Sequence, residues 1–339
     1  MHISEGEDSK GPSAGPILNF GDIFDIPRLQ RAIRAPVLDW RQVKDPRSQS
    51  IDDLGCWNIW GTVNSSKVPH WTVAHERLKL DISYTIVPKW VKLVPGNNID
   101  RHVSFWSLAA LSYNTTRFEN PSPPSRSPKH GVSLPPDKHL LCFDNLYWVG
   151  AKWPHEWNEE ISPAWRFVGR HIYWTPKIRE LANTYVRKAL RVPPHEPTPQ
   201  YITVHARNGG FGERCKVPLE ECFTPLSAIA QGVEEVKAEL LATKGITVDA
   251  VIVTSDEKNR TWWDAVARQG WLRPDHSRTV ERHGLWYPML IDAAIQAASI
   301  GFVGTEDSTV SLLAAKRVKA WYDGSTRSVR SVRLHSDDH

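Results

Sequence analysis

After residue 200 the chain alternates between short apolar runs and longer amphipathic stretches, and this alternation limits the fold more than any other feature. The apolar runs predict strands, and the stretches with apolar residues at helical spacing predict helices. The expected strands cover 201–206, 249–256, 301–304 and 319–323, and the expected helices cover 225–242, 260–271, 285–300 and 308–318. Such alternation is typical of a parallel sheet covered on both faces. The predicted fold class is therefore α/β, with a doubly wound, Rossmann-like C-terminal domain.

Before residue 200 the pattern is less regular, although the 339 residues are enough for two domains of about 150 residues each. Asp25 and Pro27 predict the start of a helix, and apolar spacing predicts another over 175–192. A proline-rich stretch predicts a linker between the domains. The expected order is a disordered start, an N-terminal α/β domain, the linker, the Rossmann-like domain and a disordered tail, at 1–16, 17–190, 191–200, 201–327 and 328–339.

Composition and charge exclude several classes of protein. No run approaches the roughly 18 apolar residues of a membrane helix, and the acidic, polar first fifteen residues do not resemble a signal peptide. The net charge of +4 comes without a long basic run, so no nucleic-acid partner is expected. The four cysteines contain no CxxC pair, so no metal site is predicted.

The cysteines and the Asn-x-Ser/Thr triplets bear on the compartment. Six residues separate Cys215 from Cys222, a spacing that allows a small disulfide. Spacing assigns no partner to Cys56 or Cys142. Three triplets are candidates for glycosylation, at Asn64, Asn114 and Asn259. Because such triplets also arise by chance, alone they are weak evidence for a secreted protein.

The first strand of the C-terminal domain ends in His205-x-Arg207, and glycines follow at 209, 210 and 212. Because side chains alternate along a strand, His205 and Arg207 leave the same face. Arg207 offers a permanently charged fork that suits a phosphate, and the glycines let a ligand approach the backbone. Alternatively, Arg207 pairs with a carboxylate and His205 is a buried histidine with its own partner. The residues alone leave the two interpretations open.

Two acidic residues stand at informative positions. Asp256 ends the second strand between Ser255 and Glu257, where it either faces a ligand beyond the strand ends or caps the following helix. Asp292 lies in a helix that is apolar on nearly every side, so its carboxylate is expected to be paired or to contact a ligand. Guanine offers two adjacent N–H donors that one carboxylate accepts together.

The third strand runs into a loop and then into a helix that opens with Ser308 and Thr309. The free N–H groups and the dipole of a helix N-terminus attract anions, and the two hydroxyls add donors. Glu306 and Asp307 stand just before this helix and would repel a phosphate unless they point away. The sequence therefore indicates an anion site at this helix N-terminus, provided that Glu306 and Asp307 point away from it.

Four segments together resemble the GDP-fucose-dependent fucosyltransferases, in particular the protein O-fucosyltransferase-like proteins common in fungi. The segments are HARNGGF (205–211), TSD (254–256), IDAA (291–294) and FVGTEDSTVS (302–311). No single segment is decisive, but their order and spacing resemble those of the family over about 200–325. The resemblance implies a type B glycosyltransferase-like fold with two Rossmann-like halves, inversion at the sugar carbon, and no cofactor or metal besides the donor substrate GDP-fucose.

The resemblance also implies roles for individual residues. Arg207 is expected to hold the β-phosphate as the catalytic residue, with His205 beside the ribose and phosphates. Asp292 is expected on the guanine, and Asp256 at the wall of the nucleotide pocket. The pyrophosphate is expected near the N-terminus of the last helix, at Ser308, Thr309 and the backbone of Val310. The family further implies a protein or glycan acceptor and the lumen of the Golgi or endoplasmic reticulum.

Two departures from the family pattern qualify the function. Gly209-Gly210-Phe211 stands where the family has Gly-Asp-Phe, so the loop lacks that carboxylate. The N-terminal Gly-Phe-x-Asn-Gln-Arg segment of the family does not occur, which predicts an incomplete N-terminal α/β domain and puts enzymatic activity in question. The main interpretation is an inverting, metal-independent O-fucosyltransferase. The alternatives are a non-catalytic relative that binds nucleotide sugars or glycans, and a truncated product that lacks the catalytic segment.

Overall fold

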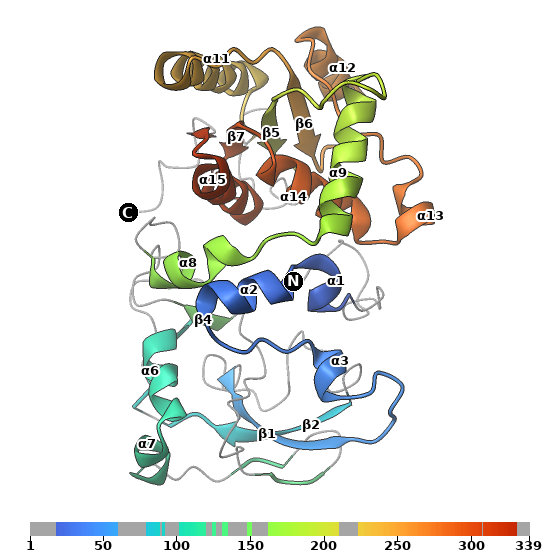
Figure 1. The fold of residues 1–339 in the computed structure, drawn as a ribbon. Coiled ribbons are helices and arrows are strands. Elements are labelled where there is room, and N and C mark those ends of the chain that lie inside the picture. The colour runs from blue at the N-terminus through green and yellow to red at the C-terminus, as the bar shows by residue number, and fades with distance from the viewer. Residues whose placement is uncertain are drawn as a thin grey trace. The chain divides into compact units, whose positions relative to one another are not determined.

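The computed structural model describes residues 18–59, 79–88, 90–91, 102–119, 124–126, 131–134, 148–150, 162–209, 223–306 and 308–330 (Figure 1). The chain forms two compact units: unit 1 is Met1–Ile17 with Leu38–Trp165, and unit 2 is Leu18–Val37 with Arg166–His339. The sequence-based division differs here, because it places 18–37 and 166–190 in the N-terminal domain.

Unit 1 contains two parallel strand pairs. β1 (Asp52–Asn58) pairs with β2 (Leu80–Ile86), and β3 (Val103–Ser104) pairs with β4 (Val149–Gly150). The described helices are α3 (Trp40–Val43), α6 (Phe105–Ala109), the 3-10 turn η1 (Ala110–Ser112) and α7 (Asn114–Glu119). The described core of the unit includes buried Trp57, Ile59, Leu108 and Leu111.

One cysteine of unit 1 corrects the sequence analysis. Cys56 is fully buried in β1 and is disulfide-bonded, although sequence spacing assigned it no partner. Spacing along the chain cannot show which cysteines the fold brings together. Cys142, Cys215 and Cys222 lie outside the described residues, so the Cys215–Cys222 bridge stays a prediction.

Unit 2 is built on a four-stranded parallel sheet. In spatial order its strands are β6 (Val251–Ser255), β5 (Ile202–Ala206), β7 (Gly301–Thr305) and β8 (Ser325–Val329). His205 on β5 pairs with Thr254 on one side and with Gly304 on the other. From β5 the chain crosses to β6 on one side of it, and the next crossover leads to β7 on its other side. The topological switch point therefore lies between β5 and β7.

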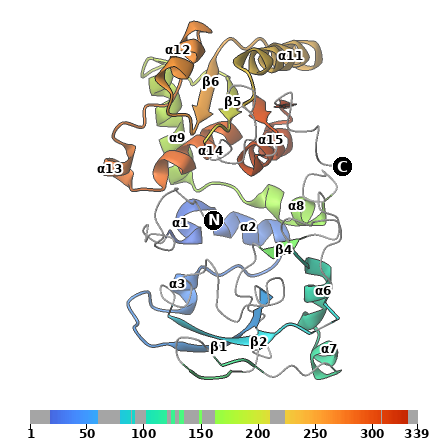
Figure 2. The same cartoon turned by 180° about the vertical axis from the view of Figure 1, so that it is seen from behind.

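Helices cover both faces of this sheet, as predicted (Figures 1 and 2). Alternate residues of β5 (Ile202, Val204 and Ala206) pack in one core with α11 (Leu226–Lys244) and α12 (Arg260–Arg268). The opposite face meets α9 (Pro176–Ala189), α14 (Tyr287–Ala297) and α15 (Thr309–Tyr322). α13 (Thr279–His283) precedes α14, and α8 (Pro163–Phe167) and the 3-10 turn η4 (Gly169–His171) precede α9.

The segment 18–37 belongs to unit 2 because stacked aromatic and cationic side chains connect it to α15. It contains α1 (Phe20–Ile23) and α2 (Ile26–Ile33), and Asp25 caps α2 as predicted. Arg28 of α2 lies 3.4 Å from the ring centre of Tyr173, which stacks on Trp321 of α15 at 4.2 Å. Arg317 of α15 lies over Trp321 and Trp174. Sequence periodicity contains no sign of such long-range contacts.

Two predictions at the end of unit 2 are wrong. The stretch 319–323, predicted as a strand, is the last turn and C-cap of α15, and the last strand is β8 at 325–329. Part of β8 falls in the predicted disordered tail. β8 is polar because it is an edge strand whose Arg327 lies 3.1 Å from Glu235 and 2.6 Å from Glu239 of α11. These partners are far away in sequence, so local polarity was misleading.

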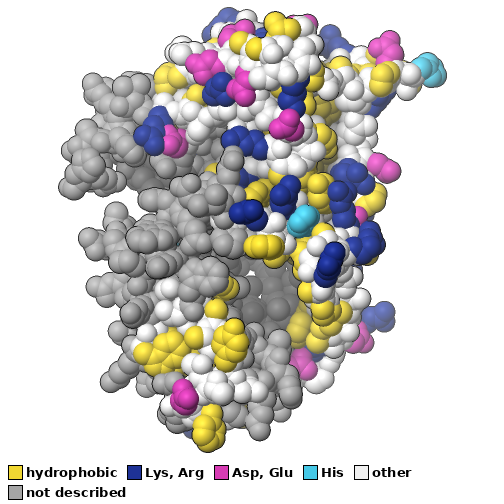
Figure 3. All heavy atoms as spheres, turned by 60° about the vertical axis from the view of Figure 1, so that its left-hand side comes forward, with side chains coloured by type: hydrophobic (Ala, Val, Ile, Leu, Met, Phe, Trp, Pro, Cys, Tyr) yellow, Lys and Arg dark blue, Asp and Glu magenta, His cyan; other side chains and the backbone are white. Residues whose placement is uncertain are grey.

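The charges are distributed unevenly over the described surface. On the face seen in Figure 3, acidic and basic side chains intermingle at the top of the view, and Lys and Arg predominate at its middle right.

Candidate functional site

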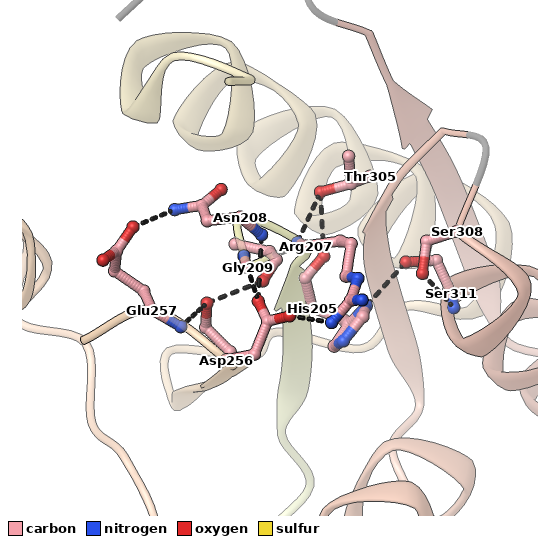
Figure 4. Close-up of polar contacts among 11 residues, drawn as sticks. His205, Arg207, Asn208, Gly209, Asp256, Glu257, Thr305, Ser308 and Ser311 are labelled. Atoms are coloured by element: carbon pink, nitrogen blue, oxygen red, sulfur yellow. Dashed lines mark hydrogen bonds and ion pairs between the residues drawn. The ribbon is translucent and has the colours of Figure 1, made fainter. Parts of the chain in front are cut away.

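The candidate site lies at the carboxyl edge of the unit 2 sheet, where polar residues from β5, β6, β7 and α15 meet (Figure 4). His205 and Arg207 come from the end of β5, Asp256 follows β6, and Thr305 ends β7. Ligands of open α/β sheets bind at such an edge, next to the switch point. The structure therefore brings His205, Arg207, Asp256 and Ser308 of the predicted site into one region.

His205 is buried with 8% of its surface exposed, on the same face of β5 as Thr203. Its Nδ1 lies 2.8 Å from the Oγ of Ser311 in α15. Burial, together with the smaller effect of the positive charge of Arg207, lowers the pKa of His205 to about 4. His205 is therefore neutral at pH 7, and its Nε2 has no hydrogen-bond partner among the described residues. The sequence analysis missed Ser311, since only the packing of α15 places it here.

The lowered pKa predicts that His205 makes the fold sensitive to acid. The unfolded state, with a His pKa near 6.5, binds the proton more tightly than the folded state, so stability present above pH 6.5 is lost as the pH falls towards 4. The shift corresponds to about 3 kcal/mol at most. We expect His205→Asn to flatten the fall in unfolding free energy between pH 6.5 and 4.5, measured by urea denaturation. The exposed His195→Asn is the control, and equal slopes in parent and His205→Asn would contradict the prediction.

Arg207 lies just beyond β5, with its backbone and its side chain both engaged. Its N–H donates to Thr305 Oγ1 at 3.1 Å, and its Nη1 pairs with Asp256 Oδ2. The carboxylate pairing that the sequence left open is therefore present. The Arg207 side chain is nevertheless 39% exposed, so part of it is accessible to a ligand.

Asp256 also holds the loop that follows β5. Its Oδ1 accepts from the backbone N–H groups of Asn208 and Gly209, both at 2.9 Å. A Cβ on Gly209 would lie 2.9 Å from Asp256 Oδ2, so only glycine permits this approach. Asp256, just after β6, thus orders the start of the loop that follows β5. Glu257 adds a bond from the Asn208 side chain at 2.8 Å.

The helix after β6 begins at a different residue from the one considered in the sequence analysis. Asn259 caps α12, its Oδ1 accepting from Thr261 N at 2.8 Å, so Asp256 is not the cap. Asn259 is exposed, as is Asn114 at the first residue of α7, and both stay candidates for glycosylation. Asn64 lies outside the described residues.

At the N-terminus of α15, the structure describes only Glu306 of the two acidic residues that the sequence analysis required to point away. Ser308 is buried and caps the helix, its Oγ accepting from Ser311 N at 3.3 Å, whereas Thr309 is exposed and Val310 half-buried. Glu306 does not face this helix end alone, because Arg330 pairs with it. Asp307 lies outside the described residues.

Asp292 belongs to a second polar network rather than to the Arg207 cluster. Its Oδ1 lies 2.8 Å from His276 Nε2, and the two side chains are 22% and 23% exposed. Burial raises the pKa of the Asp292 carboxyl, and the hydrogen bond from His276 opposes that rise. The expectation that this carboxylate is paired is confirmed, while contact with a ligand stays a prediction. No sequence signal identified His276.

Two searches of the described residues bear on metals and membranes. They contain no group of three or more His, Cys, Asp or Glu side chains placed to hold a metal ion. None of their helices combines the length and the apolar character needed to cross a bilayer.

Comparison with known proteins gives similarity in structure only. No protein-family model and no curated protein sequence matches the chain significantly. Two crystal forms of POFUT1 (protein O-fucosyltransferase 1) in complex with GDP-fucose give TM-scores of 0.52 and 0.54, covering 93% and 96% of this chain and 84% and 87% of theirs. POFUT1 in complex with GDP gives 0.51, with coverage of 96% and 87%. All are 14% identical, so the similarity shows the fold, and the predicted α/β, type B glycosyltransferase-like class is confirmed.

Proposed function

We propose that the protein transfers fucose from GDP-fucose to a hydroxyl group of a protein or glycan, with inversion at the sugar carbon, and that unit 2 holds the GDP. The observation that carries the proposal is the position of Arg207. Asp256 and Thr305 fix it at the switch point of a parallel sheet, with its side chain partly exposed. The fold similarity to POFUT1 bound to GDP-fucose and GDP supports the same class of ligand.

Three kinds of donor converge at this edge of the sheet. Arg207 supplies a guanidinium that suits phosphate oxygens. The neutral His205 has its Nε2 available as a donor when that nitrogen carries the proton. The amides of Thr309 and Val310 precede the first hydrogen bonds of α15, which reach Ser308 from residues 311 and 312. Because the N-terminus of a helix carries partial positive charge, a diphosphate fits this place.

The chemistry that these residues support is departure of the diphosphate. As the acceptor oxygen attacks the anomeric carbon, the bond from that carbon to the β-phosphate oxygen breaks and negative charge grows on the phosphate. Arg207 would stabilise this charge more than the charge of the bound substrate, and such differential stabilisation accelerates a reaction. Neither a metal nor a cofactor is part of the proposal.

The experiment is a calorimetric titration of the protein with GDP, followed by an assay of GDP release from GDP-fucose with and without acceptor glycoproteins. We expect saturable binding of one GDP per chain and release that depends on an acceptor. Binding without release would identify the non-catalytic alternative, a nucleotide-sugar-binding relative. Absence of GDP binding would contradict both.

We place this activity in the lumen of the secretory pathway. Disulfide-bonded Cys56 fits an oxidising compartment, and Asn114 and Asn259 are exposed sequons. The measurement is a mobility shift of the protein from eukaryotic cells on enzymatic removal of N-glycans, and the absence of both glycan and disulfide from that material would argue against this location.

A further inference from the structure

A chain of four polar side chains in unit 2 leads to Asp292. Tyr185 of α9 places its hydroxyl 2.7 Å from Thr279 Oγ1, and Thr279 Oγ1 lies 3.0 Å from His276 Nδ1. His276 Nε2 lies 2.8 Å from Asp292 Oδ1. The Tyr185 and His276 rings also stack, with centroids 5.3 Å apart. This network of side chains therefore joins α9, α13, the loop before α13, and α14.

The chemistry of these groups determines which of them donates and which accepts in each hydrogen bond. An ionised Asp292 only accepts, so His276 donates from Nε2 and, when neutral, its Nδ1 accepts. Thr279 then donates its hydroxyl proton to Nδ1 and accepts one from Tyr185. Each polar hydrogen has one acceptor, and the Oδ2 of Asp292 has no hydrogen-bond partner among the described residues. The network therefore holds one carboxylate oxygen and leaves the other as an acceptor.

The position of Asp292 along α14 brings it level with the candidate site. Gln296, one turn later, donates from Nε2 to Thr254 Oγ1 of β6 at 2.8 Å. α14 leads into the start of β7, so its N-terminal direction points to the carboxyl edge of the sheet. Four helical residues rise about 6 Å, and the two strand residues from Thr254 to Asp256 rise about 6.6 Å. Asp292 therefore lies near the height of Asp256.

We propose that His276, held by Thr279, is a positioning residue that orients Asp292 to select the base of a purine nucleoside diphosphate. The inference rests on the proposed function and deepens it. A carboxylate oxygen that only accepts favours guanine, which presents an N1–H and a 2-amino group side by side. Hypoxanthine keeps only the N1–H on that edge, and adenine presents an unprotonated N1, which would face the carboxylate unfavourably.

The test compares the affinities for GDP, IDP and ADP, measured by calorimetry on the full chain. We expect the parent to bind GDP most tightly. His276→Phe keeps the ring but removes both hydrogen bonds. It should weaken GDP binding about tenfold, since the loss of a hydrogen bond to a charged group lowers affinity by about tenfold or more. ADP binding should stay within about twofold of the parent value. Thr279→Val keeps the shape of the side chain and should give a smaller loss in the same direction.

The matched control is His283→Phe on α13, where the His283 ring lies against the Tyr287 ring at 5.6 Å between centroids. It should leave all three affinities unchanged. Equal losses for GDP and ADP in His276→Phe and Thr279→Val, or an unchanged GDP to ADP ratio in both, would overturn the inference and leave the proposed function in place. A parent that binds none of the three nucleotides would overturn the proposed function, and this inference with it.

Discussion

Arg207→Ala is expected to weaken GDP binding about 100-fold. Among the described residues of the cluster around Asp256, Arg207 alone carries a permanent positive charge, and its partly exposed side chain is held at the switch point. A hydrogen bond to a charged group contributes about 1.5–3 kcal/mol, and the upper figure corresponds to about 100-fold, since 1.4 kcal/mol is a tenfold change in affinity. Calorimetric titration of parent and variant with GDP measures the effect.

Arg207→Lys should recover only part of this affinity. An ammonium group cannot contact Asp256 and a phosphate through one planar fork. If the protein is a transferase, turnover of GDP-fucose should fall further than GDP affinity in both variants, because charge on the phosphate grows in the transition state. Arg278→Ala is the control, since Arg278 is exposed and pairs with Glu281 on α13. GDP binding that survives unchanged in Arg207→Ala would remove this residue from the site.

Gly304→Ala is expected to destabilise unit 2 by about 1–3 kcal/mol, the usual cost of overpacking a close-packed core. A Cβ at Gly304 would lie 2.6 Å from the Cβ of Ser311 and 2.6 Å from Cε1 of the buried Phe302. Both contacts must be relieved, one by α15 moving away from β7 and the other by the Phe302 ring shifting. Because Ser311 also contacts His205, the change should weaken GDP binding as well. Urea denaturation and GDP titration measure the two effects.

The double variant Gly304→Ala with Ser311→Gly provides the test of the cause. Removing the Ser311 Cβ relieves one of the two close contacts, so the combined loss of stability should be smaller than the sum of the separate losses. Strictly additive losses would show that the Gly304 methyl group acts elsewhere.

Much of the fold of unit 2 follows from local pattern. The apolar runs at 201–206, 249–256 and 301–304 coincide with β5, β6 and β7, because a strand buried on both faces must be apolar over its whole length. The helices between them follow the apolar stripe that each must bury. β8 was missed, because an edge strand can be polar when its charged side chain has partners, as Arg327 does.

The candidate site was predictable only in part. The end of β5 placed His205 and Arg207 on one face, and the alternation of strands and helices placed the neighbouring strand ends beside them. The partners of His205 and Arg207 could not be predicted. Asp256 lies 49 residues from Arg207, and Ser311 lies 106 residues from His205. No periodicity in the sequence specifies pairings over such distances.

By itself, the sequence determined the class of the fold and the edge of the sheet at which a ligand would bind. Both follow from the hydrophobic period and from the order of strands and helices along the chain, which short stretches of sequence show. Only the tertiary structure decided that Asp256 holds the backbone of Asn208 at the start of the glycine loop, that His276 pairs with Asp292, and that Cys56 has a disulfide partner. These contacts depend on how elements far apart in the chain pack. A polar or charged group is stabilised by whichever partner the folded chain brings within hydrogen-bond distance, and local sequence does not encode that distance.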